Sequence, residues 1–214
     1  MNNLAEWLDL ETGTVSDALD ALGLPGSIQG IRAVVPGSTM VGIAYTVRYT
    51  PAGSSAGSVG DFLDDVPAGS VVAIDNGGRL DCTVWGGIMS EVALRRDLAG
   101  TAINGVSRDT AVATQLGYPL FTRGSFMRTG KDRVQLESVG EVISFGECQV
   151  RQGDLLIGGP DGLVVVPAMR AADVLDRARA IHDAEARIVG RVREGQSLVD
   201  ARLAEGYHEL QRTR

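Results

Sequence analysis

Residues 71–109 read VVAIDNGGRLDCTVWGGIMSEVALRRDLAGTAINGVSRD, and this stretch contains the strongest signals of the fold. Two short apolar runs, Val71–Asp75 and Thr101–Ile103, are typical of buried strands. The first run ends at Asn76-Gly77-Gly78, and a Trp85-Gly86-Gly87 turn leads into an expected helix over Ile88–Arg96 before the second run. Strands and helices that alternate in units this short predict a parallel βαβ arrangement.

The same alternation continues toward the C-terminus. We expect a helix over Thr110–Leu116 and a third strand over Pro119–Thr122. Short strands separated by glycine-containing turns should follow. These strands are expected at Val139–Phe145, Glu147–Val150, Asp154–Ile157 and Leu163–Val166.

The N-terminal part combines a helix with strands. Leu10–Leu22 has helical periodicity, and either Thr12 or Thr14 is expected to cap it. Ile31–Thr50 carries strand signals on both sides of a Pro-Gly turn. A Gly/Ser-rich loop over residues 53–60 should lead into a short helix.

A long helix is expected from about Ala168 to Glu194, and it carries one carboxylate within an apolar stripe. Glu185 either forms an ion pair with an arginine or lies at the helix edge, or it is delivered into a site, that of a neighbouring chain included. We interpret residues 1–214 as one α/β domain, in which 168–214 is a helical segment that packs on the core or on a neighbouring subunit. The stripe comprises Val174, Ala178, Ile181, Glu185, Ile188 and Val192.

Composition excludes several classes of function. A net charge of −7 over 214 residues argues against a nucleic-acid-binding protein. No run approaches the length of a membrane span, and the start of the chain does not resemble a signal peptide, so we expect a cytoplasmic protein without membrane contact. Cys82 and Cys148 offer no disulfide framework, and two histidines are too few for a His-rich zinc site.

The residues Gly86, Gly87, Ile88 and Met89 form the first candidate binding element. Backbone N–H groups at the start of a helix are free to bind an anion, so this turn is a candidate site for a substrate carboxylate. The alternative is a tight turn that needs glycine for backbone reasons alone.

Arg108 and Asp109 form the second candidate element. They follow an expected parallel strand, and the ends of such strands are where α/β sheets bind ligands. An arginine fork binds carboxylates, and an adjacent carboxylate suits a hard metal ion. The alternatives are a surface ion pair or an Asp109 that caps the following helix.

Together these elements predict chemistry on a small 2-oxo acid. With Mg²⁺ or Mn²⁺ held at Asp109, Arg108 and the Gly86–Met89 backbone would bind the acid while an enolate forms. Cleavage of a 4-hydroxy-2-oxo acid and decarboxylation of oxaloacetate yield the same pyruvate enolate. Imine chemistry would have to rest on Lys131, the one lysine of the chain, which we interpret as a loop charge.

On these motifs the chain resembles the family of 4-hydroxy-4-methyl-2-oxoglutarate aldolases and the related regulator of ribonuclease activity A (RraA-like). The similarity covers most of the length. It includes the early TVSDAL helix and the strand pair after Pro36-Gly37. It continues through Trp85-Gly86-Gly87, GVSRD (105–109), and the segment from Gly153-Asp154 to Pro167.

The resemblance implies a swivelling β/β/α domain that assembles as trimers or hexamers with a site between subunits. It implies that Arg108 binds the pyruvyl unit and that Asp109 holds Mg²⁺. It also implies an acid from a neighbouring chain's C-terminal region, for which Glu185 is the candidate. The aldolases tend to carry an acidic residue where this chain has Gly87.

Three functions follow from the resemblance. The leading one is a metal-dependent aldolase that releases pyruvate from a 4-hydroxy-2-oxo dicarboxylic acid, with oxaloacetate decarboxylation as a side activity. The second is a non-catalytic regulator that binds a ribonuclease or another protein. The third is a lyase or hydratase for a different 2-oxo acid.

Overall fold

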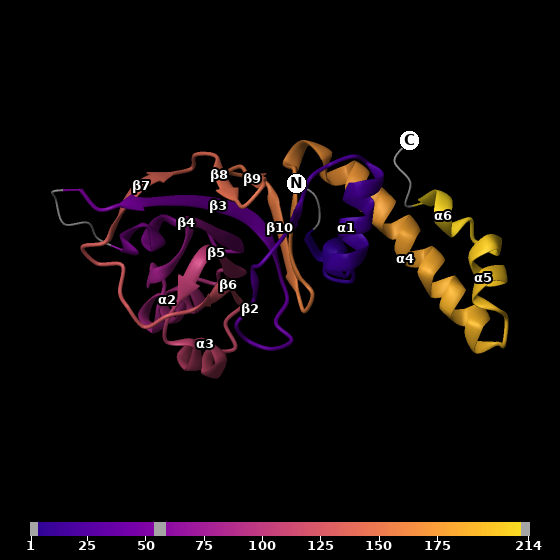
Figure 1. Ribbon diagram of the computed structural model, residues 1–214, viewed down its shortest axis with the longest axis horizontal. Coiled ribbons are helices and arrows are strands. Elements are labelled where there is room, and N and C mark those ends of the chain that lie inside the picture. Colours follow the sequence, from indigo (N-terminus) through magenta and orange to yellow (C-terminus); the bar gives the residue numbers. More distant parts are fainter. Residues whose placement is uncertain (1–3, 54–58, 211–214) are drawn as a thin grey trace.

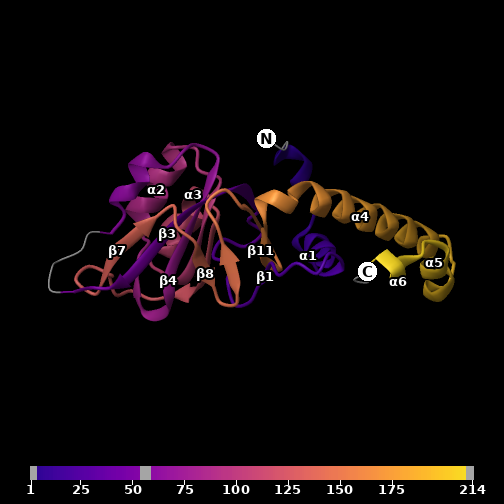
Figure 2. The same cartoon turned by 90° about the horizontal axis from the view of Figure 1, so that it is seen from above.

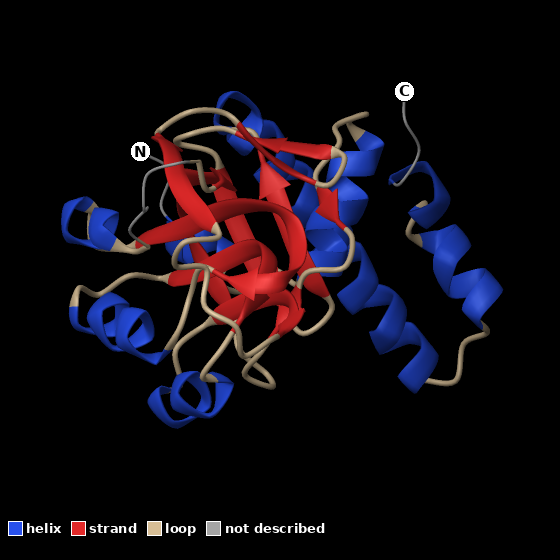
Figure 3. Ribbon diagram, turned by 60° about the vertical axis from the view of Figure 1, so that its left-hand side comes forward, coloured by secondary structure: helices blue, strands red, loops and turns tan. Residues whose placement is uncertain are grey.

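The computed structural model describes residues 4–53 and 59–210, which form a mixed α/β fold around a nine-stranded sheet (Figure 1). The helices lie around the sheet, and the C-terminal helices extend beyond one side of it (Figure 3). The strands are β1 Ser27–Ile28, β2 Arg32–Ala33, β3 Met40–Pro51, β4 Ser70–Thr83, β5 Gly100–Ser107, β6 Leu120–Ser125, β7 Val134–Val139, β8 Ile143–Phe145, β9 Cys148–Val150, β10 Leu155–Gly159 and β11 Gly162–Val166. The helices are α1 Thr12–Ala21, α2 Gly87–Arg95, α3 Thr110–Leu116, α4 Ala171–Arg193, α5 Leu198–Ala204 and α6 Tyr207–Leu210, with 3₁₀ turns η1 Leu4–Trp7, η2 Asp61–Asp65 and η3 Ala168–Arg170.

Four neighbouring strands, β3 to β6, run parallel at the centre of the sheet. The chain passes from β4 through α2 to β5 and through α3 to β6, which confirms the predicted βαβ section. The flanking strands pair antiparallel in the order β1, β11, β10 on one side and β2 on the other, while β7 pairs with β3. A separate hairpin, β8–β9, lies outside this sheet.

Each face of the central strands has its own apolar core, because successive residues of a strand point to opposite faces. Val72, Ile74 and Ile103 belong to the core beneath α2 and α3. Val71 and Phe121 pack on the opposite face against the β8–β9 hairpin. Burial on both faces explains why these strands read as continuous apolar runs in the sequence.

The N- and C-terminal helices pack together on β10 and β11, which forms a third core. Beyond this contact, α4 extends away from the sheet, and α5 and α6 fold back beside it (Figures 1 and 2). Glu205 links these helices, since its carboxylate accepts hydrogen bonds from the Nε atoms of Arg187 (2.6 Å) and Arg191 (2.9 Å).

Several predicted boundaries were wrong. The first helix begins at Thr12, so Thr12 and Thr14 lie inside it, and neither caps the helix: Glu11 is at the N-cap without a side-chain bond. The strand that was expected to end at Asp75 continues to Thr83, because pairing with β5 resumes after a bulge at Gly77-Gly78. The strand predicted over 139–145 is divided between β7 and β8.

The environment of Glu185 matches one of the predicted alternatives, the helix-edge position. Ala184 lies in the buried seam of α4, and Glu185 lies at its edge, half-buried. Its carboxylate accepts a hydrogen bond from the Tyr207 hydroxyl at 2.8 Å, so its partner is a tyrosine rather than an arginine.

Within residues 4–53 and 59–210, no helix is both long and apolar enough to cross a membrane. Cys82 and Cys148 are both buried free thiols. Part of the Gly/Ser-rich loop predicted over 53–60 lies outside the described residues, and the short helix predicted after it is η2.

Candidate active site

Two loops lie side by side at the ends of β4 and β5. Because these parallel strands are neighbours, with Thr83 opposite Val106, the segments that follow them leave the same edge of the sheet. Gly86 lies between β4 and α2, Gly87 is the first residue of α2, and Arg108 and Asp109 lie between β5 and α3. The Arg108 N–H donates to the Trp85 carbonyl at 3.0 Å and joins the two loops.

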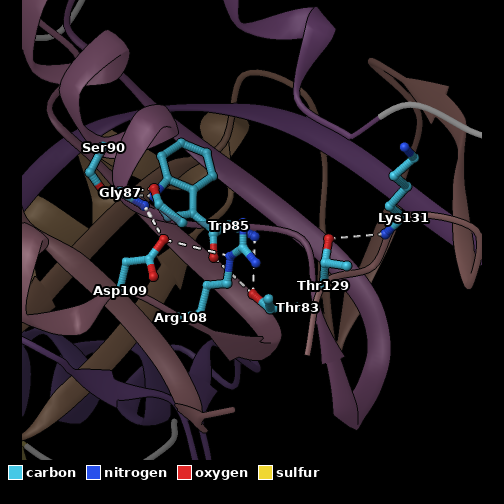
Figure 4. A network of polar contacts seen from close by, with 9 residues as sticks. Thr83, Trp85, Gly87, Ser90, Arg108, Asp109, Thr129 and Lys131 are labelled. Atoms are coloured by element: carbon cyan, nitrogen blue, oxygen red, sulfur yellow. Dashed lines mark hydrogen bonds and ion pairs between the residues drawn. The ribbon is translucent and has the colours of Figure 1, made fainter. Parts of the chain in front are cut away.

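The Asp109 carboxylate binds the start of α2 (Figure 4). Its Oδ2 accepts a hydrogen bond from the Gly87 N–H at 3.0 Å and lies 3.5 Å from the Arg108 Nε. Asp109 is at the N-cap position of α3 and pairs with Arg108, as the alternatives expected, but its side chain makes no capping hydrogen bond to α3. Its φ of +55° is in the left-handed region, which aspartate tolerates better than most residues and which recurs at functional sites.

The turn that carries Gly86 rests on a buried hydrogen-bonded support. The Thr83 hydroxyl donates to the Trp85 carbonyl (2.8 Å), and the Trp85 Nε1 donates to the Ser90 hydroxyl (3.0 Å). The Trp85 ring stacks on Tyr118 with 6.2 Å between centroids, and burial raises the pKa of Tyr118. These buried hydrogen bonds and the ring contact hold the turn in one geometry.

A side chain at either glycine of the turn would crowd its neighbours. A β-carbon at Gly86 would lie 2.8 Å from the Asp109 Oδ2 and 3.2 Å from the Arg108 Nε. A β-carbon at Gly87 would lie 3.3 Å from three atoms of Val112 on α3. Glycine therefore lets α2 approach the Arg108-Asp109 loop and α3 closely.

A cavity of about 590 Å³ opens at this point. All the predicted residues of the two loops line this cavity. Glu185 does not line it, because α4 lies at the other end of the molecule (Figure 1). The predicted members are Gly86, Gly87, Ile88, Met89, Arg108 and Asp109. The remaining walls are Val59, Asp61, Thr83, Val84, Trp85, Thr129 and Lys131.

Lys131 and Thr129 were missed as cavity residues. They lie in the loop before β7, and Gly130 between them would place a β-carbon 2.6 Å from the Thr83 carbonyl oxygen. The glycine allows this loop to lie against β4. A Thr-Gly-Lys turn was the one available sequence signal, and it carries no information about which strand it contacts.

The backbone donors at the start of α2 are partly occupied. The Gly87 N–H is bonded to Asp109, which leaves the N–H groups of Ile88 and Met89 as the free donors of the predicted anion nest. With the half-exposed Arg108 guanidinium, they form the positive part of the cavity.

Among the described residues, no three His, Cys, Asp or Glu side chains gather as a metal cluster. Asp109 offers a carboxylate to the cavity, and Asp61 also lines it. Mg²⁺ is a hard ion that keeps several waters and is often held by one or two carboxylates together with substrate oxygens. This donor set therefore fits Mg²⁺ or Mn²⁺ but not a site built from protein ligands alone.

Comparison with known proteins points to one family. The family model RraA-like (Aldolase/RraA) matches residues 12–165. The chain is 33% identical over 204 residues to Protein DlpA of Legionella pneumophila. The match covers 94% of this chain and 33% of DlpA, so the chain spans about a third of that protein's length. It is 30% identical to a provisionally named 4-hydroxy-4-methyl-2-oxoglutarate aldolase of Halalkalibacterium halodurans, covering 82% of this chain and 81% of the relative. A crystal structure of an uncharacterized protein from Pseudomonas syringae pv. tomato matches with a TM-score of 0.88 and 43% identity, over 93% of this chain and 96% of the other.

Proposed function

Because this chain belongs to the RraA-like (Aldolase/RraA) family, we propose that it is a divalent-metal-dependent lyase that cleaves a 4-hydroxy-2-oxo dicarboxylic acid, such as 4-hydroxy-4-methyl-2-oxoglutarate, to pyruvate. Oxaloacetate decarboxylation is the proposed side activity. The observation that carries the proposal is the convergence of Arg108, Asp109 and the start of α2 on one cavity.

Substrate binding follows from the donors in the cavity. The Arg108 fork binds the carboxylate and the 2-oxo oxygen of the pyruvyl unit, and the N–H groups of Ile88 and Met89 bind the same carboxylate. The ion pair with Asp109 and the Trp85 carbonyl hold the Arg108 side chain and backbone in place. With the pyruvyl unit bound in this way, the other end of the substrate lies toward Lys131 and Asp61.

The reaction breaks the C3–C4 bond of the substrate. The C4 hydroxyl loses its proton and becomes the second carbonyl, while the bonding electron pair remains on the pyruvyl unit as an enolate that later takes a proton at C3. Arg108 stabilises the negative charge that develops on the 2-oxo oxygen. Asp109 would hold a divalent cation, which when bound supplies Lewis-acid stabilisation of that charge.

Glu185 stays a prediction for a second carboxylate. Within one chain it lies on α4 and is bonded to Tyr207, away from the cavity. It would reach such a site only in a neighbouring chain, in an assembly that is also a proposal.

The test couples pyruvate release to lactate dehydrogenase and NADH, with oxaloacetate or 4-hydroxy-4-methyl-2-oxoglutarate as substrate and Mg²⁺ present. Arg108→Ala removes up to two charge-assisted hydrogen bonds to the enolate, each about 1.5–3 kcal/mol, and should lower kcat/KM by about 10²–10⁴-fold. Its half-exposed ion pair contributes about 0–1 kcal/mol to folding, so the variant should stay folded. The matched control is Arg95→Ala, which removes an exposed arginine of α2 outside the cavity and should retain activity.

A chelator distinguishes the metal mechanism from an imine at Lys131. EDTA should abolish pyruvate release, and Mg²⁺ or Mn²⁺ should restore it. Activity that resists EDTA but is lost in Lys131→Arg would contradict the metal mechanism. No pyruvate from any substrate, after spontaneous oxaloacetate decay is subtracted, would contradict the lyase proposal and favour the regulator alternative.

A further inference from the structure

A buried carboxylate outside the candidate active site orients an amide. Asp75 on β4 is 9% exposed and accepts hydrogen bonds from the Gly77 N–H (2.9 Å), the Ser144 N–H (3.3 Å) and the Asn104 Nδ2 (2.9 Å). The Asn104 Nδ2 also donates to the Ser144 carbonyl at 3.0 Å. Both amide hydrogens of Asn104 are therefore committed, so its Oδ1 is directed toward Arg123.

Asn104 in turn holds the Arg123 guanidinium. The Arg123 Nε donates to the Asn104 Oδ1 at 2.6 Å, and the two terminal nitrogens have no hydrogen-bond partner among the residues that the structure describes. Glycines flank both nitrogens: a β-carbon at Gly30 would lie 2.9 Å from Nη1, and one at Gly146 would lie 3.6 Å from Nη2. The arginine is fixed at Nε, and the absence of a β-carbon at Gly30 and Gly146 lets both glycines lie close to its fork without covering it.

Arg123 lines a second cavity of about 460 Å³, formed by α1, the turn before β1 and the β8–β9 hairpin, and Gly146 beside its Nη2 lines the same cavity. Arg123 follows Phe121 by two residues on β6 and so points to the sheet face that the hairpin covers. No residue lines both this cavity and the candidate active site, which lies on the α2–α3 side. The buried side chains of Phe145 and Cys148 form part of its wall.

The charges in this cavity have both signs. Arg123 offers two parallel N–H donors, the geometry that binds a carboxylate bidentately. The carboxylates of Asp20 and Glu147 line the same cavity. They disfavour a simple anion such as phosphate and suit an ammonium group. A ligand that carries both a carboxylate and an ammonium group therefore complements the charges of the residues that line the cavity.

We propose that this cavity is a second binding site, for an α-amino acid whose carboxylate binds the Arg123 fork and whose ammonium group faces Glu147 and Asp20. Asn104 and Asp75 are positioning residues, because they orient the fork and do not touch the ligand. The site is independent of the proposed lyase activity, and its test does not use that activity.

The first experiment measures thermal unfolding of the full chain with each of the twenty L-amino acids at millimolar concentration, followed by calorimetric titration. An amino acid at about 100-fold above its Kd should raise the unfolding midpoint by about 5–10 °C. The matched carboxylic acid without the amine and the matched amine without the carboxylate should each bind at least about 10-fold more weakly. No shift with any amino acid, or equal binding of the deaminated acid, would overturn the proposal.

Variants locate the site. Arg123→Gln should abolish the shift, and Glu147→Gln should remove the preference for the amino acid over its deaminated analogue. Arg151→Gln is the matched control, since this exposed arginine lies outside the cavity, and it should keep full binding. Binding that survives Arg123→Gln would overturn the assignment.

A readout on the unaltered protein covers the case in which Arg123→Gln fails to fold. Residues 145–148 of the β8–β9 hairpin line the cavity, so a bound ligand should slow amide hydrogen exchange of this segment, followed by mass spectrometry. At about 100-fold above Kd the exchange rate should fall by up to about 100-fold. Unchanged exchange of the hairpin with an amino acid bound would place the ligand elsewhere and refute the site.

Discussion

Replacing Gly86 by alanine tests whether the geometry of the candidate active site, rather than its composition, supports activity. Gly86 has extended backbone angles (φ −152°, ψ −170°) that any residue adopts, so the substitution adds no backbone strain. The new β-carbon would lie 2.8 Å from the Asp109 Oδ2, and reaching the ordinary contact distance of 3.4 Å moves that oxygen by about 0.6 Å. The Arg108 Nε, at 3.2 Å, must move as well.

The expected effects on activity and stability differ in size. A misplacement of about 1 Å at a reacting centre costs about 10²-fold, so kcat/KM should fall by about 10- to 100-fold. The displaced atoms are the ends of half-exposed side chains, and the one bond at risk joins the Gly87 N–H to Asp109. Losing that bond costs about 1 kcal/mol, which lowers Tm by no more than about 4 °C.

The assay is the coupled release of pyruvate, run beside a thermal unfolding scan. Gly13→Ala is the control, because a β-carbon there meets nothing within 4 Å and sits in the first turn of α1. It should leave kcat/KM unchanged and leave Tm equal or slightly higher. If Gly86→Ala keeps kcat/KM within about twofold, the positions of Arg108 and Asp109 do not govern the reaction, and the reasoning is refuted.

Two further predictions concern the resemblance and the C-terminal helices. Gly87→Asp adds a carboxylate and should lower the Mg²⁺ concentration for half-maximal activity by about 10-fold. Val112→Ala is included to make room, because the new β-carbon would lie 3.3 Å from Val112. An unchanged Mg²⁺ requirement would show that position 87 does not contact the metal. Hydrogen bonds from Arg187 and then Arg191 lower the pKa of Glu205 from its ordinary 4.5, so its stabilisation of α4 and α5 is present above about pH 4.5 and is lost as pH falls through the lowered pKa. Limited proteolysis should therefore find Glu205→Gln less resistant than the parent at pH 7 and equal to it in acid, and equal resistance at both pH values would contradict this.

The central elements were predictable because their signals are local. Val71–Asp75 and Thr101–Ile103 are buried on both faces and therefore read as apolar runs, and the glycine turn marks where α2 begins. The length of β4 was not predictable. Gly77-Gly78 looked like an end, and only pairing of Thr83 with Val106 on β5 shows that the strand continues.

The candidate site was predictable in its two loops because parallel neighbouring strands place their C-terminal ends together. Lys131 was not, because it comes from a loop before β7 that lies close to Thr83 through tertiary packing alone. No periodicity relates the two segments.

Residues a few positions apart were enough to predict the α/β class, the βαβ order, the glycine turn and the adjacent Arg108-Asp109 pair. Which groups these side chains bind depends on tertiary packing. Asp109 binds the start of α2 instead of capping its own helix, Glu185 pairs with Tyr207, and Asn104 turns its oxygen to Arg123. The physical reason is that a buried polar group takes the partner that packing brings within hydrogen-bond distance, and packing joins elements that are distant in the chain.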